Sequence, residues 1–455
     1  MGSTSGINIS SLLSALGSTS SGINVSSAVA SAINALSTPE LQWEQDQQTL
    51  QTDTTGINQI QTDVSALQNS LNELGDPAGA IASMTATSSD ANVVSASAAP
   101  GTATGSHIIV VNNIATTASW YSNSVASSSA TLASGSFTLQ VGEGTPTTIQ
   151  IGTGTNTLDE LASSINTQNL GVTASVINDS SGSRLAIVSN SSGSANGVTI
   201  SGASGLTFTQ ASAGQDASLT VDGIPIDSAS NAVTGAVAGL TLNLLGTAPQ
   251  QQVTVTVTPD ATDAAQAINT FVGAYNTAIG DVNTQYTVSA SNQEGPLAGD
   301  FTVQMLQNTL LSVAGYTGGG NGVSTLADLG ISMNKDGTLT VDSATLNNAI
   351  QNTFSAVQSF MQGTSSNGFA SFLNNALDTL TDPTTGAFSV DLQSMSTENS
   401  DLQTQINNFQ TYLNTQQTLL TTEYNNADIA LQKIPEEEAQ LNAELGYPPN
   451  STQSS

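Results

Sequence analysis

The chain of 455 residues contains no cysteine and only three basic residues, Arg184, Lys335 and Lys433. Without cysteine it can form neither disulfide bonds nor thiolate metal sites. Its 34 acidic residues give a formal net charge of −31. A chain with so little positive charge cannot neutralise nucleic-acid phosphates, and an anionic membrane surface would repel it. We therefore expect neither nucleic acid nor a membrane among its partners.

Catalytic side chains are scarce as well. The single histidine, His107, begins a predicted strand after a Gly-Ser turn, which indicates a surface or strand-edge residue rather than a general base. Acidic pairs occur at residues 159–160 and 436–438. Both fall in predicted first helical turns, where carboxylates stabilise the helix dipole. We predict a structural or interaction protein with no enzyme activity, no metal and no cofactor.

Signals for membrane insertion and secretion are also missing. No apolar stretch approaches the length of a transmembrane helix. The N-terminus has no basic residue before its weakly apolar Leu12 and Leu13, so no secretory signal peptide is evident. The sequence therefore predicts no insertion into a membrane.

The strongest pattern that is present lies at residues 392–445, where apolar residues recur at steps of three, four and seven. Such spacing is the heptad pattern of a coiled coil. The seam residues chosen there are Leu402, Ile406, Phe409, Leu413, Leu420, Tyr424 and Leu431. Because proline removes a backbone donor and clashes one turn back, Pro435 predicts a kink or break, with residues 436–438 opening a short last helix.

A second amphipathic helix is predicted from Pro39 to Gly75. Its seam residues are Leu50, Ile57, Ile60, Val64, Leu67 and Leu71. A seam of this length needs a partner, so we expect the two helices to pair antiparallel as a stalk, with Leu67 and Leu71 near the C-terminal seam. The alternative is that the two helices pack separately into globular cores.

Between these helices the sequence alternates like β-strands. The predicted strands cover residues 93–97, 107–111, 137–141, 148–151, 171–177, 184–188, 217–221, 240–244 and 252–258. Thr157 and Glu160 predict a capping box at the start of a helix over residues 157–166. Further helices are expected at residues 264–286, 300–313 and 343–362. The fold class is a multidomain α+β protein, in which an antiparallel coiled-coil stalk carries inserted β-rich heads.

The predicted parts are a flexible segment, a discontinuous stalk, two β-rich heads and a tail. The segment is 1–38, the stalk 39–100 with 260–445, the first head 101–118 with 214–259, the second head 119–213, and the polar tail 446–455. The short apolar clusters of residues 1–38 cannot fold alone, so we expect this segment to be disordered in the monomer.

An ordered series of motifs resembles one family. Five segments resemble the flagellar filament cap family, also called hook-associated protein 2. They are Gly214-Gln-Asp-Ala217, Leu219-Thr-Val-Asp-Gly223, Phe271-Val-Gly-Ala-Tyr-Asn276, Gly295-Pro-Leu-Ala-Gly-Asp300 and Leu329-Gly-Ile-Ser332. Ser21-Gly-Ile-Asn-Val-Ser26 and Ala86-Thr-Ser-Ser-Asp90 match its N-terminal segment. Residues 157–175 are similar to the flagellin hook repeat of flagellar axial proteins. The resemblance covers about residues 20–445.

This resemblance implies a secreted protein that leaves through the flagellar type III channel and forms a ring at the filament tip. The ring, commonly a homopentamer, would keep flagellin from leaking away and promote its polymerisation. The implied partners are further copies of the chain, flagellin and a flagellar export chaperone. Two alternatives stay open: flagellin itself, whose characteristic N-terminal segment is not seen here, and a surface adhesin whose β head binds glycans or mucin.

The scarcity of basic residues also bears on assembly. Salt bridges cannot select the coiled-coil partner, so subunit contacts should rest on apolar area and on Asn, Gln and Thr hydrogen bonds. The charge of −31 opposes association at long range. We therefore expect a monomer at low salt and ring formation as the salt concentration rises.

Overall fold

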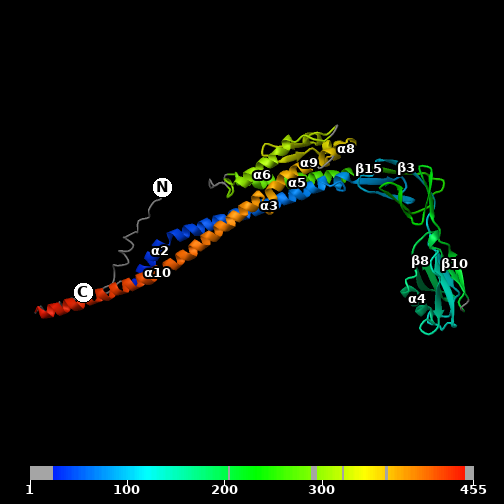
Figure 1. Ribbon diagram of the computed structural model, residues 1–455, viewed down its shortest axis with the longest axis horizontal. Coiled ribbons are helices and arrows are strands. Elements are labelled where there is room, and N and C mark those ends of the chain that lie inside the picture. The colour runs from blue at the N-terminus through cyan, green and yellow to red at the C-terminus, as the bar shows by residue number, and fades with distance from the viewer. Residues whose placement is uncertain (1–23, 203–204, 288–294, 320–321, 364–366, 446–455) are drawn as a thin grey trace.

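The computed structural model describes residues 24–202, 205–287, 295–319, 322–363 and 367–445 as an elongated molecule (Figure 1). A long helical leg leads into a helical bundle, a first β head follows the bundle, and a second β head lies at the far end. Residues 25–36 and the C-terminal part of the leg lie toward the end of the molecule opposite the heads. The helical bundle therefore lies between the leg and the β heads.

Two long helices form the leg. Helix α3 covers Thr38–Gly75 and helix α10 covers Ala387–Glu444. Hydrogen bonds join Gln47 to Asn399 and Glu40 to Gln410, so residue numbers rise along one helix as they fall along the other. The heptad spacing explains this pairing, because it keeps one apolar stripe of each helix facing its partner. The predicted antiparallel pairing of the N- and C-terminal helices is confirmed.

Residues 25–36, which we expected to be disordered, are helical. Helix α2 covers Val25–Leu36 and packs against α10, with Ala28 and Val29 buried. Its Asn24 caps the first turn by accepting a hydrogen bond from the Ser27 amide. The stretch can order because α10 covers its apolar face, a contact that the isolated segment lacks. Residues 1–23 and the predicted tail 446–455 lie outside the described residues.

The side chains of Ser37 and Thr38, at the start of α3, do not cap this helix. Their hydroxyl groups donate to the carbonyls of Asn34 and Ala35 in the preceding helix. The chain turns for a single residue at Ser37 and continues as helix. Since α2 already supplies carbonyl partners, the two hydroxyls complete its last turn instead.

Helix α10 continues through Pro435, so the predicted break and the separate short last helix are wrong. Its 58 residues run from Ala387 to Glu444 with Pro435 inside. Proline costs about 3 kcal/mol in a helix interior, because it removes one hydrogen bond and crowds the preceding turn. The good helix formers on both sides, with Leu, Gln and Lys before it and Glu, Ala and Gln after it, outweigh that local loss.

The upper half of α3 enters a helical bundle with its own core. The other elements of the bundle are α5 (Ala261–Gln285), α6 (Phe301–Leu311), α7 (Ser343–Asn352), α8 (Phe354–Gln362), α9 (Phe369–Thr381) and the hairpin of β16 (Ile331–Met333) and β17 (Leu339–Val341). The helix predicted over residues 343–362 is two helices, broken at Thr353. Helix α9 has no counterpart among the predicted elements.

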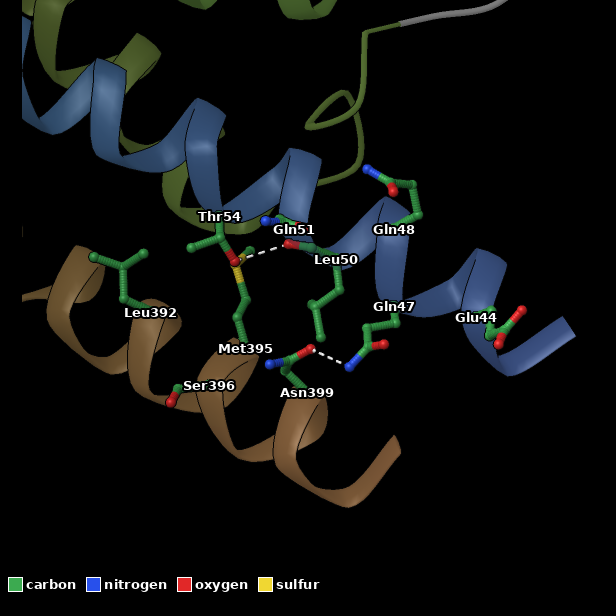
Figure 2. A pocket seen from close by; sticks show the side chains of 10 residues that line it. All are labelled: Glu44, Gln47, Gln48, Leu50, Gln51, Thr54, Leu392, Met395, Ser396 and Asn399. Atoms are coloured by element: carbon green, nitrogen blue, oxygen red, sulfur yellow. Dashed lines mark hydrogen bonds between the residues drawn. The ribbon is translucent and has the colours of Figure 1, made fainter. Parts of the chain in front are cut away.

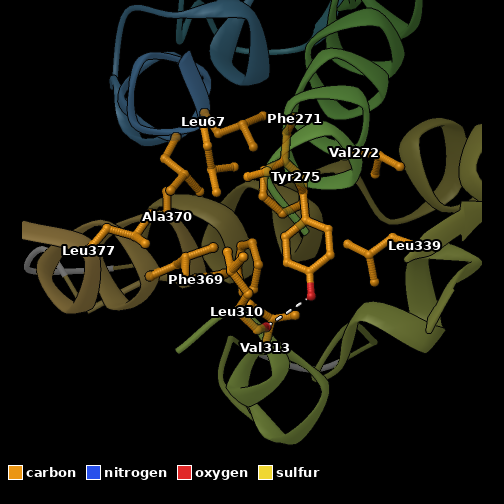
Figure 3. Close-up of a cluster of buried hydrophobic side chains, with 14 of the residues drawn as sticks. Leu67, Phe271, Val272, Tyr275, Leu310, Val313, Leu339, Phe369, Ala370 and Leu377 are labelled. Carbon is orange, nitrogen blue, oxygen red and sulfur yellow. Dashed lines mark hydrogen bonds between the residues drawn. The ribbon is translucent and has the colours of Figure 1, made fainter. Parts of the chain in front are cut away.

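Leu67 and Leu71 do not lie against the C-terminal helix as predicted. Both are buried in the bundle core, where α3 packs against α5 and α9. Figure 3 shows Leu67 beside Phe271 of α5 and Ala370 of α9. Gln68 of α3 also donates to Asp378 of α9 at 2.6 Å. Helix α9 takes the place that we assigned to α10, so the alternative of separate globular packing holds for this half of α3.

The first β head consists of two antiparallel sheets packed face to face. The five-stranded sheet has the order β1 (Met84–Ser88), β15 (Val253–Pro259), β3 (Gly105–Asn113), β11 (Ala217–Val221), β12 (Ile224–Ser228). The three-stranded sheet has the order β13 (Ala232–Val237), β14 (Leu240–Leu244), β2 (Val94–Ala98). Asp222 and Gly223 join β11 to β12 with φ of 51° and 82°, the positive values that a type I′ hairpin needs.

The predicted boundary between the stalk and the first β head, at residue 100, lies too far along the chain. Strands β1 and β2 precede it, yet β1 pairs with β15 and β2 pairs with β14 inside the first head. Met84 and Val94 belong to the core of that head. The boundary was misplaced because the strands that complete these sheets are about 150 residues further along the chain.

The second β head has a separate core. One sheet has the order β10 (Phe208–Ser212), β4 (Ser119–Ser122), β8 (Gly182–Ser189), β7 (Val172–Asp179), and the other has the order β6 (Thr147–Ile151), β5 (Gly135–Val141), β9 (Val198–Ser201). Helix α4 (Leu158–Thr167) packs on β7. Strands β4, β9 and β10 were not predicted, because they are short and rich in Ser and Thr, and their partners in the sheets stabilise them.

Thr157 caps α4, but the predicted capping box is not reciprocal. The Thr157 hydroxyl accepts a hydrogen bond from the Glu160 amide at 3.2 Å. The Glu160 carboxylate reaches one residue further back and accepts from the Asn156 amide at 3.0 Å. The amides of Leu158 and Asp159, also free at the start of α4, donate to the Ser128 carbonyl.

Candidate assembly surface of the helical leg

Amide side chains make the polar contacts between the two leg helices. Gln47 Nε2 donates to Asn399 Oδ1 at 3.0 Å and to Gln403 Oε1 at 3.2 Å. Gln410 Nε2 donates to Glu40 Oε1 at 2.7 Å. Across the described residues, the ion pairs are His107–Asp222 and Arg184–Asp179, both in the β heads. Neutral amides therefore set the register of the leg, in a sequence that has almost no cations.

An aromatic contact anchors the lower part of the leg. The rings of Trp43 and Phe409 meet edge to face, with centroids 5.3 Å apart and planes at 84°. The ring of Tyr412 stacks on Phe409, with centroids 5.6 Å apart. Such pairs add about 0.5–1.5 kcal/mol beyond the area they bury. Sequence reasoning missed Trp43, although it lies one heptad before Leu50 and so belongs to the same stripe.

The structure divides the predicted seam residues among three environments. Five seam residues of α3 are buried in the bundle core, namely Ile57, Ile60, Val64, Leu67 and Leu71. Two seam residues of α10 are buried in the leg, namely Ile406 and Leu413. Leu50, Leu402, Phe409, Leu420 and Tyr424 are half-buried, whereas Leu431 is exposed. The apolar stripes of α3 and α10 therefore pack against each other only in the leg. In the bundle, the same stripe of α3 packs against other helices.

A groove opens where α3 and α10 separate to enter the bundle (Figure 2). Its volume is about 460 Å³, and its lining is mainly amide and hydroxyl side chains, with Leu50, Leu392 and Met395 as the large apolar contributors. Thr54 closes one end, where its hydroxyl donates to the Leu50 carbonyl at 2.8 Å. The lining holds one carboxylate, Glu44, and no nucleophile or base beside it. This chemistry suits packing against another chain rather than catalysis.

The far end of the leg exposes apolar side chains. Every residue from 429 to 441 is exposed, and Ile429, Ile434 and Leu441 each expose more than half of their surface, at 52%, 54% and 57%. Leu36, Leu41 and Leu419 add exposed apolar area further up. Exposed apolar side chains on a helix are typical of contact sites for another protein. We call residues 429–444 of α10 the distal leg face.

The described parts of the chain contain no group of three or more acidic or histidine residues that could hold a metal ion. Within the same residues, no helix is both long enough and apolar enough to cross a bilayer.

The comparison with family models covers most of the chain. Residues 21–118 match the flagellar hook-associated protein 2 N-terminus, and residues 214–436 match the flagellar hook-associated protein 2 C-terminus. Residues 136–191, in the second β head, match the flagellin hook IN motif. The two matches to the hook-associated protein 2 family lie before and after the second β head. They follow the same order along the chain as the family motifs in the sequence.

Individual relatives agree with the family models. The B-type flagellar hook-associated protein 2 of Pseudomonas aeruginosa is 29% identical over 395 residues, covering 78% of this chain and 83% of the relative. The flagellar hook-associated protein 2 of Aeromonas caviae is 26% identical over 389 residues, covering 78% and 82%. The crystal structure of the D1-D2-D3 domains of the Escherichia coli flagellar cap protein FliD aligns with a TM-score of 0.62 at 25% identity, covering 75% of this chain and 99% of that chain.

Proposed function

Since this chain belongs to the flagellar hook-associated protein 2 family, the caps of the bacterial flagellar filament, we propose how its leg, bundle and heads divide that work. It is a structural protein at the filament tip outside the cell, not an enzyme. The alternative of an adhesin with a glycan-binding head gains no support from these relatives.

We propose that the leg carries the contacts between subunits of a ring, which we expect to be a homopentamer. The main support is the distal leg face, whose apolar side chains are exposed in the single chain. Because the described leg contains no ion pair, apolar area and amide hydrogen bonds supply the attraction between subunits. Covering the exposed side chains in the ring would remove them from water.

The two β heads lie at the opposite end of the molecule from the leg (Figure 1). We propose that in the ring they form a plate over the open end of the filament. Such a plate would hold back each newly exported flagellin while the legs guide it to its binding site. Before assembly, an export chaperone would cover the distal leg face and prevent aggregation.

A strain that lacks this chain provides the test. The full chain supplied from a plasmid should restore long filaments in electron micrographs and reduce free flagellin in the medium. A variant with Leu431→Ser, Ile434→Ser and Leu441→Ser should leave flagellin in the medium, because the distal leg face has lost its apolar area.

The matched control carries Ile224→Ser and Leu245→Ser, which remove exposed apolar side chains from the first β head. It should restore filaments if the leg is the assembly surface. Loss of filaments in the control with normal filaments in the leg variant would reverse the assignment of leg and head.

A further inference from the structure

Two stretches of chain join the two β heads. Residues 114–118 run from β3 of the first head to β4 of the second, and residues 213–216 return from β10 to β11. The stretches pair at one point, where Thr116 and Gln215 exchange amide-to-carbonyl hydrogen bonds of 2.9 and 3.2 Å. A single pair of strands is only marginally stable by itself. This connection alone would therefore let the second head swing.

A loop of the second head also contacts the first head. We call residues 192–194, which follow β8, the brace loop. Ser192 Oγ donates to the carbonyl of Ala229, a residue just after β12, at 2.7 Å. The Gly193 amide donates to the Thr116 carbonyl at 3.1 Å. The two heads are thus attached at a third place, besides the two stretches of chain.

A carboxylate next to β11 holds the end of the brace loop. The two oxygens of Asp216 accept from the Ser194 amide at 2.7 Å and from the Ser194 hydroxyl at 2.8 Å. The carbonyl of Asp216 accepts from Asn113 Nδ2, at the end of β3, at 2.7 Å. Hydrogen bonds to a carboxylate are shorter and stronger than those between neutral groups. Asp216 therefore ties the brace loop to strands β3 and β11 of the first head.

The brace loop approaches the first head more closely than a residue with a side chain would allow. Gly193 is buried, and its φ of 100° is one that other residues rarely adopt. A Cβ atom there would lie 2.8 Å from the Cβ atom and 3.0 Å from the carbonyl oxygen of Ala229. A Cβ atom at Gly214 would lie 2.6 Å from the Gly193 carbonyl oxygen. Backbone therefore packs directly on the neighbouring chain where the heads meet.

The outgoing stretch is fixed at both of its ends. Asn231 of the first head accepts from the Ala115 amide at 2.7 Å and donates to the Ala115 carbonyl at 2.9 Å. Ala115 belongs to the core of the first head, and Ala118 belongs to the core of the second. The part that could act as a hinge is thereby reduced to residues 116–117, with residues 213–215 of the returning stretch.

We propose that the brace loop locks the angle between the two β heads, and that release of its contacts with Ala229 and Asp216 lets the second head swing about residues 116–117 and 213–215. Figure 1 shows the second head turned away from the line of the leg and the bundle. Ser194 and Ala229 are exposed, and each head has its own core. The lock can therefore open without unfolding either head.

The lock is a property of the single chain and does not depend on the proposed ring. In that ring, the brace loop would set the direction in which each second head points, a consequence that rests on the proposed function. The experiment below measures the angle between the heads in the free chain, so it tests the lock by itself.

Spin labels in the two heads provide the test. The chain has no cysteine, so Ser97→Cys in β2 and Thr148→Cys in β6 place one label on an exposed strand position of each head. Double electron–electron resonance on the full chain should give one narrow distance distribution. Adding Ser192→Ala and Asp216→Ala should widen the distribution, because the second head is then held mainly by the two stretches of chain.

Two matched controls separate the brace loop from other effects. Asp227→Ala removes a carboxylate from an exposed position of β12, and the distribution should stay narrow. Gly193→Ala should shift or widen the distribution, because the added Cβ atom meets Ala229. Gly101→Ala should leave it unchanged, because Gly101 also has a positive φ, 74°, but a Cβ atom there meets nothing within 4 Å.

A wide distribution in the labelled chain without further substitutions would overturn the proposal, and this measurement needs no brace variant to fold. The proposal is also wrong if the distribution stays narrow in the chain with Ser192→Ala and Asp216→Ala while circular dichroism shows both heads folded. If that chain fails to fold, Ser192→Ala alone decides in the same way. All of these readouts use the chain without filaments, so their failure would leave the cap function standing, and a failed complementation would leave the lock standing.

Discussion

At the scale of single residues, Tyr275 shows how a polar atom is accommodated in the bundle core. Its side chain is fully buried, and its hydroxyl donates to the Leu310 carbonyl at 3.0 Å (Figure 3). Burial raises the pKa of Tyr275 well above its usual value, so the hydroxyl remains a donor at any physiological pH. The ring fills the space beside Phe271, and the bond ties α5 to the end of α6.

We predict that Tyr275→Phe lowers the free energy of unfolding by about 0.5–1.5 kcal/mol, the usual net value of one hydrogen bond. The Leu310 carbonyl keeps the Ser312 amide as a partner, so no buried acceptor is stranded. Tyr275→Ala should cost about 3–5 kcal/mol, because it adds a cavity. Urea unfolding of both variants checks the prediction, with Tyr412→Phe on the exposed leg as the control. Equal losses for the two Tyr275 variants would contradict it.

At the scale of elements, Pro435 should be the weak point of α10. The helix passes through it, but the Leu431 carbonyl has no amide to accept at that turn. We expect Pro435→Ala to slow hydrogen exchange over residues 431–444, by an amount that corresponds to about 3 kcal/mol. Pro39→Ala is the control, because proline at the first turn of α3 costs little and exchange there should not slow. Unchanged exchange after Pro435→Ala would show that proline does not limit this helix.

The pairing of α3 with α10 is a second prediction at this scale. The chain has no cysteine of its own, so Gln47→Cys with Asn399→Cys introduces one defined pair at a position where the side chains touch. Mild oxidation should give a disulfide within one chain, seen as a faster-migrating monomer on a gel. Gln47→Cys with Thr421→Cys should not give that band, since Thr421 lies several turns further down α10. Dimers alone from the first pair would mean that the leg helices pair between chains.

At the scale of the whole molecule, charge opposes assembly. The chain carries −31 at neutral pH, and no described ion pair lies in the leg. Added salt shortens the Debye length from about 30 Å at 0.01 M to about 10 Å at 0.1 M. We therefore predict a monomer at low salt and growing ring formation as salt rises, measured by light scattering over a salt series. Rings that form at low salt and dissociate as salt rises would show that ion pairs hold them.

Much of the architecture could be predicted because its signals are local. The three-four spacing of Ile57, Ile60 and Val64 marks an amphipathic helix whatever the stripe packs against. The alternation of residues 252–258 predicts a strand, and the structure contains it as β15. An Asp-Gly pair such as Asp222-Gly223 is a local hairpin signal, and it joins β11 to β12. The scarcity of basic side chains bounded the class of function before any fold was known.

Other features needed the tertiary structure, since they depend on neighbours that are distant in the chain. Periodicity shows that Leu67 faces a partner, but not that the partner is α9 instead of α10. Helix α2 forms on the surface of α10, and strands β1 and β2 complete sheets whose other strands follow much later in the chain. An apolar stripe specifies that a surface must be buried, and the competition among all available surfaces decides which one covers it.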